Sequence, residues 1–429
     1  MSLQFDLNAL VFSLSDALDL VGINDLYHGK RVAYMALETA AALGWSAEAR
    51  LELREAALLH DLGVSRTGVH VCLVEELDWH GAEQHCIAGA ALLGRCPPLA
   101  RIAPIVRHHH THWADLAPRG LPRPVAEAAN LIYLADSADA LIHQARVATP
   151  HAARERVRHL LVEFNRGPPR FRPEALAAFL TVSERLAFWF YLEPDGLAEY
   201  FLAARLHAQR QGVDMATLRC VALLFSHCVD AKSPYTARHS RGVARLARAL
   251  GEWCGLAVEV VERLEIAGLL HDLGKLRVPD EILEKPGPLT PLEQASMARH
   301  SFDSWRVLKG IEGLRDIAGW CGAHHEHLDG HGYPFAALGE EIPLPARILA
   351  VADIVTALAE ERPYRRPLPA ESIGTELQAL VASGHLDPAV VAVVTARLAE
   401  ACEIAYVVAP GVPAAATAPT EQATPLAPA

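Results

Sequence analysis

The sequence has 429 residues, of which 51% are hydrophobic and 21% charged, and its formal net charge is −12. This composition is typical of a globular protein with enough chain for two or three domains. The negative charge argues against binding of a nucleic-acid polymer. An anionic ligand would therefore need bound metals or individually placed arginines.

The eight cysteines are dispersed and form no C-x-x-C pair, so they predict neither a zinc-thiolate site nor a disulfide framework. The N-terminal segment contains acids within its apolar stretch and lacks a basic start, which argues against a signal peptide. The most apolar later stretch is too short to span a membrane, because it is interrupted by Ser183, Glu184 and Arg185. We therefore expect a cytoplasmic protein that does not enter a membrane.

In chain order, the sequence predicts amphipathic helices almost throughout, because Ala- and Leu-rich runs recur and alternating β-branched runs are few. Proline-rich breaks separate groups of helices at residues 119–124, 166–173 and 284–291. The Ala/Pro/Thr-rich segment 409–429 predicts a disordered tail without chemistry. The expected fold class is all-α.

An internal repeat dominates the pattern, with seven polar positions occurring twice in the same order at nearly matched spacing. In both copies an H-D pair begins 32 residues after the first histidine. The first copy consists of His28, His60, Asp61, His85, His108, His109 and Asp136. The second consists of His239, His271, Asp272, His300, His324, His325 and Asp353. Coincidence is a poor explanation for such a series, which indicates a duplicated unit.

Some of these polar residues fall on apolar helix faces. His271 follows the spacing of Leu264 and Ala267, which places it on the buried stripe of a helix. Asp353 takes a similar position four residues after Leu349. A single histidine there is usually a hydrogen-bonded core residue, but a buried carboxylate needs a cation or several donors.

Five histidines and two aspartates per copy suit two metal ions better than one. Imidazole and carboxylate ligands fit divalent transition metals such as iron, manganese, zinc or nickel. A carboxylate can bridge two ions, and one metal can lower the pKa of bound water from about 15.7 to about 7. Hydroxide held between two metals suits in-line attack at phosphorus.

Residues 213–400 resemble an HD-GYP domain, a branch of the all-helical HD metal-dependent phosphohydrolases. The matching motifs include "SPYTARHS" (233–240), "HDLGKLRVPDEIL" (271–283), "HHEHLDGHGYP" (324–334), "ARILAVADIVTAL" (346–358) and "RPYR" (362–365). The resemblance implies a phosphodiesterase that opens cyclic di-GMP to linear pGpG, with GMP as a further product, by attack of a metal-bridged hydroxide.

The resemblance also implies the metal ligands. One ion would be held by His239, His271, Asp272 and Asp353. Asp272 would bridge to a second ion held by His300, His324 and His325. Iron or manganese is expected in both positions. Tyr235 stands where some family members carry a glutamate for a third metal, so two ions are expected here.

Asp272 and Lys275 are the catalytic residues that the resemblance implies, with Lys275 meeting the charge that builds up on the phosphate during attack. The loop with Gly332, Tyr333 and Pro334 would line the guanine-nucleotide pocket. Arg362 and Arg365 would bind phosphate oxygens, because a planar guanidinium contacts two oxygens at once.

The first copy departs from the family outside its seven candidate ligands. Val64 takes the place of the lysine, Leu116-Ala117-Pro118 takes the place of G-Y-P, and nothing like "RPYR" follows Asp136. This copy resembles a degenerate HD domain with a candidate site for a further metal. Three roles stay open for it: a metal-dependent sensor, an idle scaffold, or a second phosphohydrolase with another substrate.

The expected organisation is two HD domains in tandem. A degenerate, regulatory domain would span 1–150, a helical connector 151–212, the HD-GYP domain 213–400 and an end segment 401–429. Alternatives to cyclic di-GMP hydrolysis are a 3',3'-cyclic GMP-AMP phosphodiesterase, a metal-loaded cyclic-dinucleotide sensor with little turnover, and a general nucleotidase. The aromatic helix 185–192 suits either a homodimer interface or burial between the domains.

Overall fold

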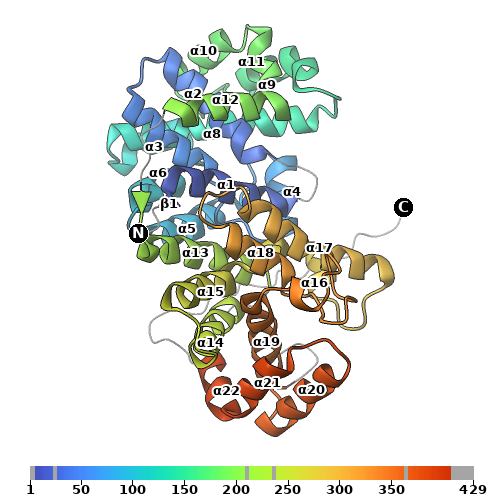
Figure 1. Ribbon diagram of the computed structural model, residues 1–429. Coiled ribbons are helices and arrows are strands. Elements are labelled where there is room, and N and C mark those ends of the chain that lie inside the picture. The colour runs from blue at the N-terminus through green and yellow to red at the C-terminus, as the bar shows by residue number, and fades with distance from the viewer. Residues whose placement is uncertain (1–4, 23–26, 208–211, 234–237, 362–365, 407–429) are drawn as a thin grey trace, which may run out of the picture.

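The computed structural model describes residues 5–22, 27–207, 212–233, 238–361 and 366–406 (Figure 1). The described chain is helical apart from β1 (Phe5–Asp6) and β2 (Gly212–Val213), which pair antiparallel. The predicted all-α class is therefore confirmed. Among the described residues, none of the helices combines the length and apolar character needed to cross a membrane.

The N-terminal domain is a bundle around α2 and α8. Its helices are α1 (Leu7–Asp19), η1 (Leu20–Gly22), α2 (His28–Ala42), α3 (Ala47–Leu58), α4 (Thr67–Glu75), α5 (Ala82–Gly94), η2 (Ala100–Ile102), α6 (Ala103–Arg107), α7 (Trp113–Leu116), η3 (Ala117–Arg119) and α8 (Arg123–Gln144). Local signals set their starts: the Asp6 side chain accepts a hydrogen bond from Asn8 N, and the Ser46 hydroxyl accepts one from Ala49 N.

The connector is helical, as expected, and packs on the N-terminal domain. It consists of η4 (Pro150–Ala153), α9 (Arg154–Phe164), α10 (Pro173–Val182), α11 (Leu186–Phe190) and α12 (Pro194–His207). Figure 1 places these helices at the end of the molecule farthest from the C-terminal domain. The aromatic helix α11 sets Phe188 against Tyr34, with ring centroids 5.4 Å apart, so it is not buried between the two domains.

The C-terminal domain repeats the bundle. Its helices are α13 (Met215–Asp230), α14 (His239–Trp253), α15 (Val258–Leu270), η5 (Leu273–Arg277), α16 (Asp280–Leu283), α17 (Pro291–Leu308), α18 (Arg315–Ala323), η6 (Gly339–Glu341), α19 (Leu344–Ala359), α20 (Ala370–Ala382), α21 (Pro388–Thr395) and α22 (Leu398–Tyr406). The apolar stripe of α14 is fully buried at Val243, Leu246 and Leu250. A capping box of Thr290 and Glu293 starts α17, the helix that carries His300.

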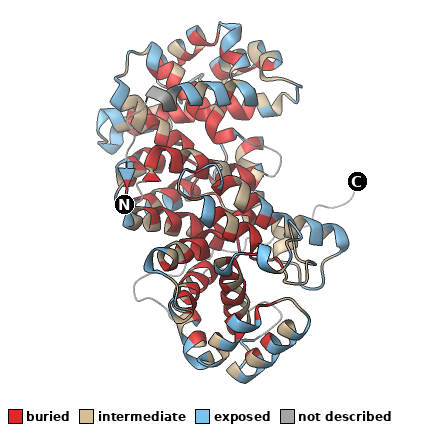
Figure 2. Ribbon diagram, in the orientation of Figure 1, coloured by how far each residue is buried: buried red, intermediate tan, exposed pale blue. Residues whose placement is uncertain are grey.

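The two domains share a buried interface through the middle of the molecule (Figure 2). Helix α1 of the N-terminal domain packs on α17 and η5 of the C-terminal domain. Lys232 is fully buried there, with Nζ 3.0 Å from Asp280 Oδ1. The same ammonium donates hydrogen bonds to Ser65 O and Thr67 Oγ1 of the N-terminal domain. The H-D turns of both copies therefore lie close to one interface.

Candidate metal centres

The fold brings together all seven predicted ligands of the C-terminal copy. They come from the start of α14, the turn after α15, the middle of α17, the end of α18 and the middle of α19, at His239, His271, Asp272, His300, His324, His325 and Asp353. The first five of these residues are at most 2% exposed. Such a set cannot be solvated by water, so its charges must be balanced within the protein.

Asp272 divides this cluster into two groups. Its Oδ2 lies 3.3 Å from His271 Nε2 and 3.8 Å from His239 Nε2. Its Oδ1 lies 3.3 Å from His300 Nε2 and 3.9 Å from His324 Nε2. Asp353 belongs to the first group, 3.0 Å from His239 Nε2. One carboxylate oxygen facing each group is the arrangement of a bridging ligand.

Hydrogen bonds from the far side of each ring fix the ring tautomers. Three Nδ1–H groups donate to the carbonyl three residues earlier: His271 to Gly268 at 2.9 Å, His300 to Met297 at 2.7 Å and His324 to Cys321 at 2.6 Å. Each Nε2 is thereby left with a lone pair. His300 Nε2 and His324 Nε2 face each other across 3.3 Å. Two facing acceptors in a buried site call for a cation between them.

The pKa values of the histidines shift in opposite directions in the two groups. Burial lowers the pKa of His300 to about 4 and that of His325 to about 3, so both are neutral at pH 7 and their lone pairs are available. Burial also lowers the pKa of His239, but its contacts with Asp353 and Glu360 outweigh this and raise it to about 10. The first group therefore attracts positive charge, which a divalent ion would supply.

Lys275 is placed by the turn that follows His271 and Asp272. Its Nζ donates to Asp272 Oδ2 at 2.6 Å, so the ammonium lies at the edge of the cluster. The glycine of the H-D-x-G-K motif is needed for contact: a Cβ on Gly274 would lie 2.0 Å from the carbonyl oxygen of His300. The motif thus packs η5 against α17 and aims Lys275 at the Asp272 carboxylate.

The G-Y-P loop covers the second histidine group. The centroid of the Tyr333 ring lies 4.8 Å from that of the His325 ring. The backbone N–H of Tyr333 donates a hydrogen bond to the backbone carbonyl of His325. A Cβ on Gly332 would lie 2.3 Å from His327 N, so only glycine fits. Pro334 follows a cis peptide bond in this turn. Arg362 and Arg365, the predicted phosphate contacts, lie outside the described residues.

The acidic residues of this motif hold the loop by accepting hydrogen bonds from backbone N–H groups. The Glu326 carboxylate accepts hydrogen bonds from Phe335 N at 2.6 Å and Ala337 N at 2.9 Å. Asp329 accepts from His331 N at 2.9 Å and caps the turn. The partner of a ligand histidine is instead Glu360, 3.0 Å from His239 Nδ1, which the sequence pattern did not reveal.

A second cluster occurs in the N-terminal domain with the same plan. Asp61 Oδ2 lies 3.5 Å from His28 Nε2, and Asp61 Oδ1 lies 3.4 Å from His85 Nε2. His60 and His109 donate from Nδ1 to the carbonyls of Ala57 and Val106, as their C-terminal counterparts do. The Nε2 atoms of His28 and His60 lie 3.2 Å apart. The donor chemistry fits divalent metals here also.

The histidine pair of this copy is shifted by one residue from its prediction. His109 takes the position of His324, and His110 lies 3.6 Å from Asp136 Oδ2. His108, which was predicted as a ligand, is only partly buried and immediately follows α6. Because three histidines are consecutive, the sequence alone does not tell which two correspond to His324 and His325. The hydrogen bond from His109 Nδ1 to the carbonyl of Val106, three residues earlier, identifies His109 as the counterpart of His324. The pair is therefore His109 and His110, not His108 and His109.

The N-terminal cluster differs from the C-terminal one in its surroundings. The Nδ1 atom of His28 lies 2.7 Å from Asp139, and Arg31 binds both oxygens of that aspartate at 2.6 and 2.8 Å. Val64, at the lysine position, is buried. A hollow at this site is lined by His70 and His143 together with the cluster. This copy thus keeps the ligands and lacks the lysine.

Comparison with known proteins agrees with this architecture. The HD domain family matches residues 25–141 and residues 223–390. The 3'3'-cGAMP-specific phosphodiesterase 1 of Vibrio cholerae is 35% identical over 387 residues, which cover 89% of both chains. A cyclic di-GMP phosphodiesterase of Pseudomonas aeruginosa is 38% identical over 172 residues, 39% of this chain and 41% of that protein.

A solved structure shares the fold over nearly the whole chain. It is a cyclic GMP-AMP specific phosphodiesterase of Vibrio cholerae, with a TM-score of 0.64 and 23% identity over 93% of this chain and 98% of that chain. The fold and the two clusters define a tandem HD-domain protein. With the full-length relative, they show that the chain belongs to the HD-GYP-type phosphodiesterases, and the predicted resemblance is confirmed.

Proposed function

We propose that the C-terminal centre hydrolyses a phosphodiester bond of a guanine-containing 3',3'-cyclic dinucleotide and yields the linear dinucleotide. The observation that carries this proposal is the Asp272 carboxylate, which faces one histidine group with each oxygen and Lys275 with Oδ2. A binding module has no need of a lysine at that place. Cyclic di-GMP is the substrate that the sequence motifs favour, with pGpG as the first product.

The proposal includes two divalent transition-metal ions, iron or manganese. His239, His271, Asp272 and Asp353 would hold one, and Asp272, His300, His324 and His325 the other. When bound, such ions acidify water and offset the charge on the phosphate. The uncompensated histidine lone pairs and the buried carboxylates support this ligand assignment.

The chain itself would orient the substrate and stabilise charge. Lys275 would donate to a non-bridging phosphate oxygen and stabilise the charge that develops there. Tyr333, against His325, would line the guanine side of the pocket, with Gly332 and Pro334 shaping the turn. Arg362 and Arg365 would bind the second phosphate of the ring.

A specific observation favours 3',3'-cyclic GMP-AMP as a second candidate substrate. The relative named for that nucleotide is similar over both domains, whereas the similarity to the Pseudomonas aeruginosa cyclic di-GMP phosphodiesterase extends over less than half of the chain. The N-terminal domain would then be part of what the two proteins share. We further propose that this domain regulates the other through the interface at Lys232.

The test is hydrolysis of both nucleotides in one reaction, followed by separation of the linear products. We expect cleavage of at least one of them by the metal-loaded protein and none by Asp272→Ala. Faster cleavage of cyclic GMP-AMP would select the second candidate. Tight binding without cleavage would reject the enzyme in favour of a sensor, and preferential hydrolysis of mononucleotides would select a nucleotidase.

The predicted homodimer stays a prediction, supported by the exposure of Leu186 and Phe190 on α11.

A further inference from the structure

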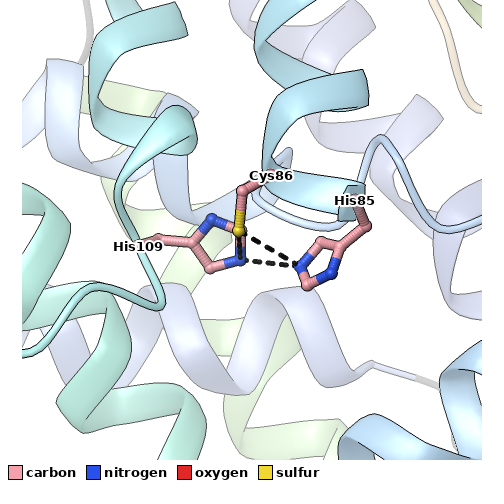
Figure 3. A group of neighbouring side chains, drawn as sticks. All are labelled: His85, Cys86 and His109. Carbon is pink, nitrogen blue, oxygen red and sulfur yellow. Dashed lines mark hydrogen bonds between the residues drawn. The ribbon is translucent and has the colours of Figure 1, made fainter. Parts of the chain in front are cut away.

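The two clusters differ at one position that can change their metal chemistry. Cys86 follows His85 in α5, where Ser301 follows His300 in α17. Figure 3 shows the Cys86 sulfur pointing toward the rings of His85 and His109. All three residues are at most 3% exposed. The Ser301 hydroxyl donates to Ala298 O and the Cys86 thiol donates to Ala82 O at 3.3 Å, each within its own helix.

The distances within this group fit a single ion. His85 Nε2 and His109 Nε2 lie 3.1 Å apart, and the Cys86 sulfur lies 3.8 and 4.0 Å from them. Zinc–nitrogen and zinc–sulfur bonds of about 2.05 and about 2.3 Å, at tetrahedral angles, separate ligands by roughly 3.3 Å for two nitrogens and roughly 3.6 Å for nitrogen and sulfur. Small side-chain rotations would bring all three atoms onto one ion.

Two further observations point to a ligand in this position. The His109 Nδ1–H donates to Val106 O at 2.6 Å, so its Nε2 lone pair faces His85 and the sulfur. Asp61 Oδ1 lies 3.4 Å from His85 Nε2 and 3.9 Å from His109 Nε2, and can supply a fourth atom. Lone pairs and a carboxylate therefore converge on the place where the thiol points.

We infer that the N-terminal domain binds a divalent metal ion with Cys86 as a thiolate ligand beside His85 and His109. The metal–sulfur bond replaces the S–H bond of Cys86, and the proton leaves to solvent. Thiolate is a softer ligand than carboxylate, so this site selects zinc or iron(II) over manganese. The inference goes beyond the proposed activity and does not depend on it, because the C-terminal cluster has Ser301 at this position.

The test uses the full-length protein, stripped of metal and titrated with cobalt(II). Thiolate bound to cobalt(II) gives a charge-transfer band in the near ultraviolet, which imidazole and carboxylate ligands do not give. We expect the band in the wild type and its loss in Cys86→Ser, a variant that introduces the residue of the C-terminal copy. Cys96→Ser is the matched control, because Cys96 is also buried and lies in the same domain, and it should keep the band.

An undiminished band in Cys86→Ser would overturn the assignment. So would a wild-type protein without the band that still loses bound cobalt on Asp61→Ala, since the N-terminal site would then be loaded without sulfur. X-ray absorption of the wild type, loaded with enough zinc to fill the candidate sites of both domains, gives a check that needs no variant. A sulfur shell at about 2.3 Å is expected, and its absence would reject Cys86 as a ligand.

Discussion

The ammonium of Lys275 lies 2.6 Å from Oδ2 of Asp272, the carboxylate that faces both histidine groups of the C-terminal centre. The corresponding residue in the N-terminal domain is Val64, which is buried. The two domains thus share a ligand plan and differ in the group that can stabilise charge on a phosphate. Our proposal assigns catalysis to the C-terminal centre on the basis of this difference.

Replacing Lys275 by methionine should reduce turnover and spare the metals. Removal of one charge-stabilising donor typically lowers kcat by about 10²–10³-fold. The measurement is the rate of cyclic-dinucleotide hydrolysis together with metals per chain, with the exposed Lys309→Met as control. Unchanged kcat in Lys275→Met would remove this residue from the catalytic assignment.

Glu360→Gln should weaken metal binding in the C-terminal centre. Glu360 lies 3.0 Å from His239 Nδ1, and loss of such an outer partner typically lowers metal affinity by about 10–100-fold. Manganese affinity measured against a chelator checks this. The neighbouring Glu361 is exposed, so Glu361→Gln should behave as the wild type. Equal affinities in all three proteins would show that His239 needs no carboxylate partner.

The two H-D turns can be perturbed by equivalent glycine substitutions. A Cβ on Gly63 or on Gly274 would lie 2.0 Å from the carbonyl oxygen of His85 or His300, respectively. Each alanine variant should destabilise its domain by about 1–3 kcal/mol through overpacking. Gly287→Ala, with no atom near the added methyl group, should leave the unfolding midpoint unchanged. Midpoints that match the wild type in all three variants would contradict this packing.

Lys232 should hold the two domains together. Its ammonium is fully buried beside Asp280, so Lys232→Met should lower the free energy of unfolding by about 3 kcal/mol. Arg66 donates to both carboxylate oxygens of Glu284, at 3.0 and 3.1 Å, and lies 3.8 Å from Asp280. Its side chain is half-exposed, so Arg66→Met should cost less than about 1 kcal/mol. Urea unfolding measures both. A larger effect of Arg66→Met would contradict the buried interface.

The metal-free protein should lose stability as the pH falls below neutral. Burial lowers the pKa of His300 from 6.5 to about 4, so between these values the unfolded chain binds a proton that the folded chain does not. The pKa of His239 is instead raised to about 10. The stability that protonated His239 contributes is therefore fully present below pH 6.5. Urea midpoints in chelator should therefore be lower at pH 5 than at pH 7. A higher midpoint at pH 5 would contradict the burial of neutral His300.

The sequence predicted the parts of the structure that repeat in order and spacing. The helical class came from periodicity, and the duplicated series predicted a repeated unit. The family resemblance added the HD domains and the seven C-terminal candidate ligands, which the fold brings together. The sequence did not reveal Glu360, which contacts His239, or Asp139, which contacts His28. Glu360 lies seven residues after Asp353, whereas Asp139 lies three residues after Asp136, so the two are not at matching positions in the copies. A partner that is not at a repeated spacing leaves no signal in a comparison of the two copies.

Other features depended on tertiary contacts. The choice among His108, His109 and His110 required the carbonyl contact of His109, because adjacent identical residues carry no register. Cys86 has no C-x-x-C partner, so its approach to His85 and His109 appears only when α5 and α6 are packed together. The connector was predicted as helical, but its position on the N-terminal domain depends on packing such as Phe188 against Tyr34.

We propose above that the C-terminal cluster is a two-metal phosphodiesterase centre bridged by Asp272. The most direct test is to count metals per chain and assay cyclic-dinucleotide hydrolysis on the same anaerobic sample, for the wild type and for Asp272→Ala. We expect the variant to lose about two metals and all activity. Full metal loading of the wild type, with no turnover of any cyclic dinucleotide, would contradict it.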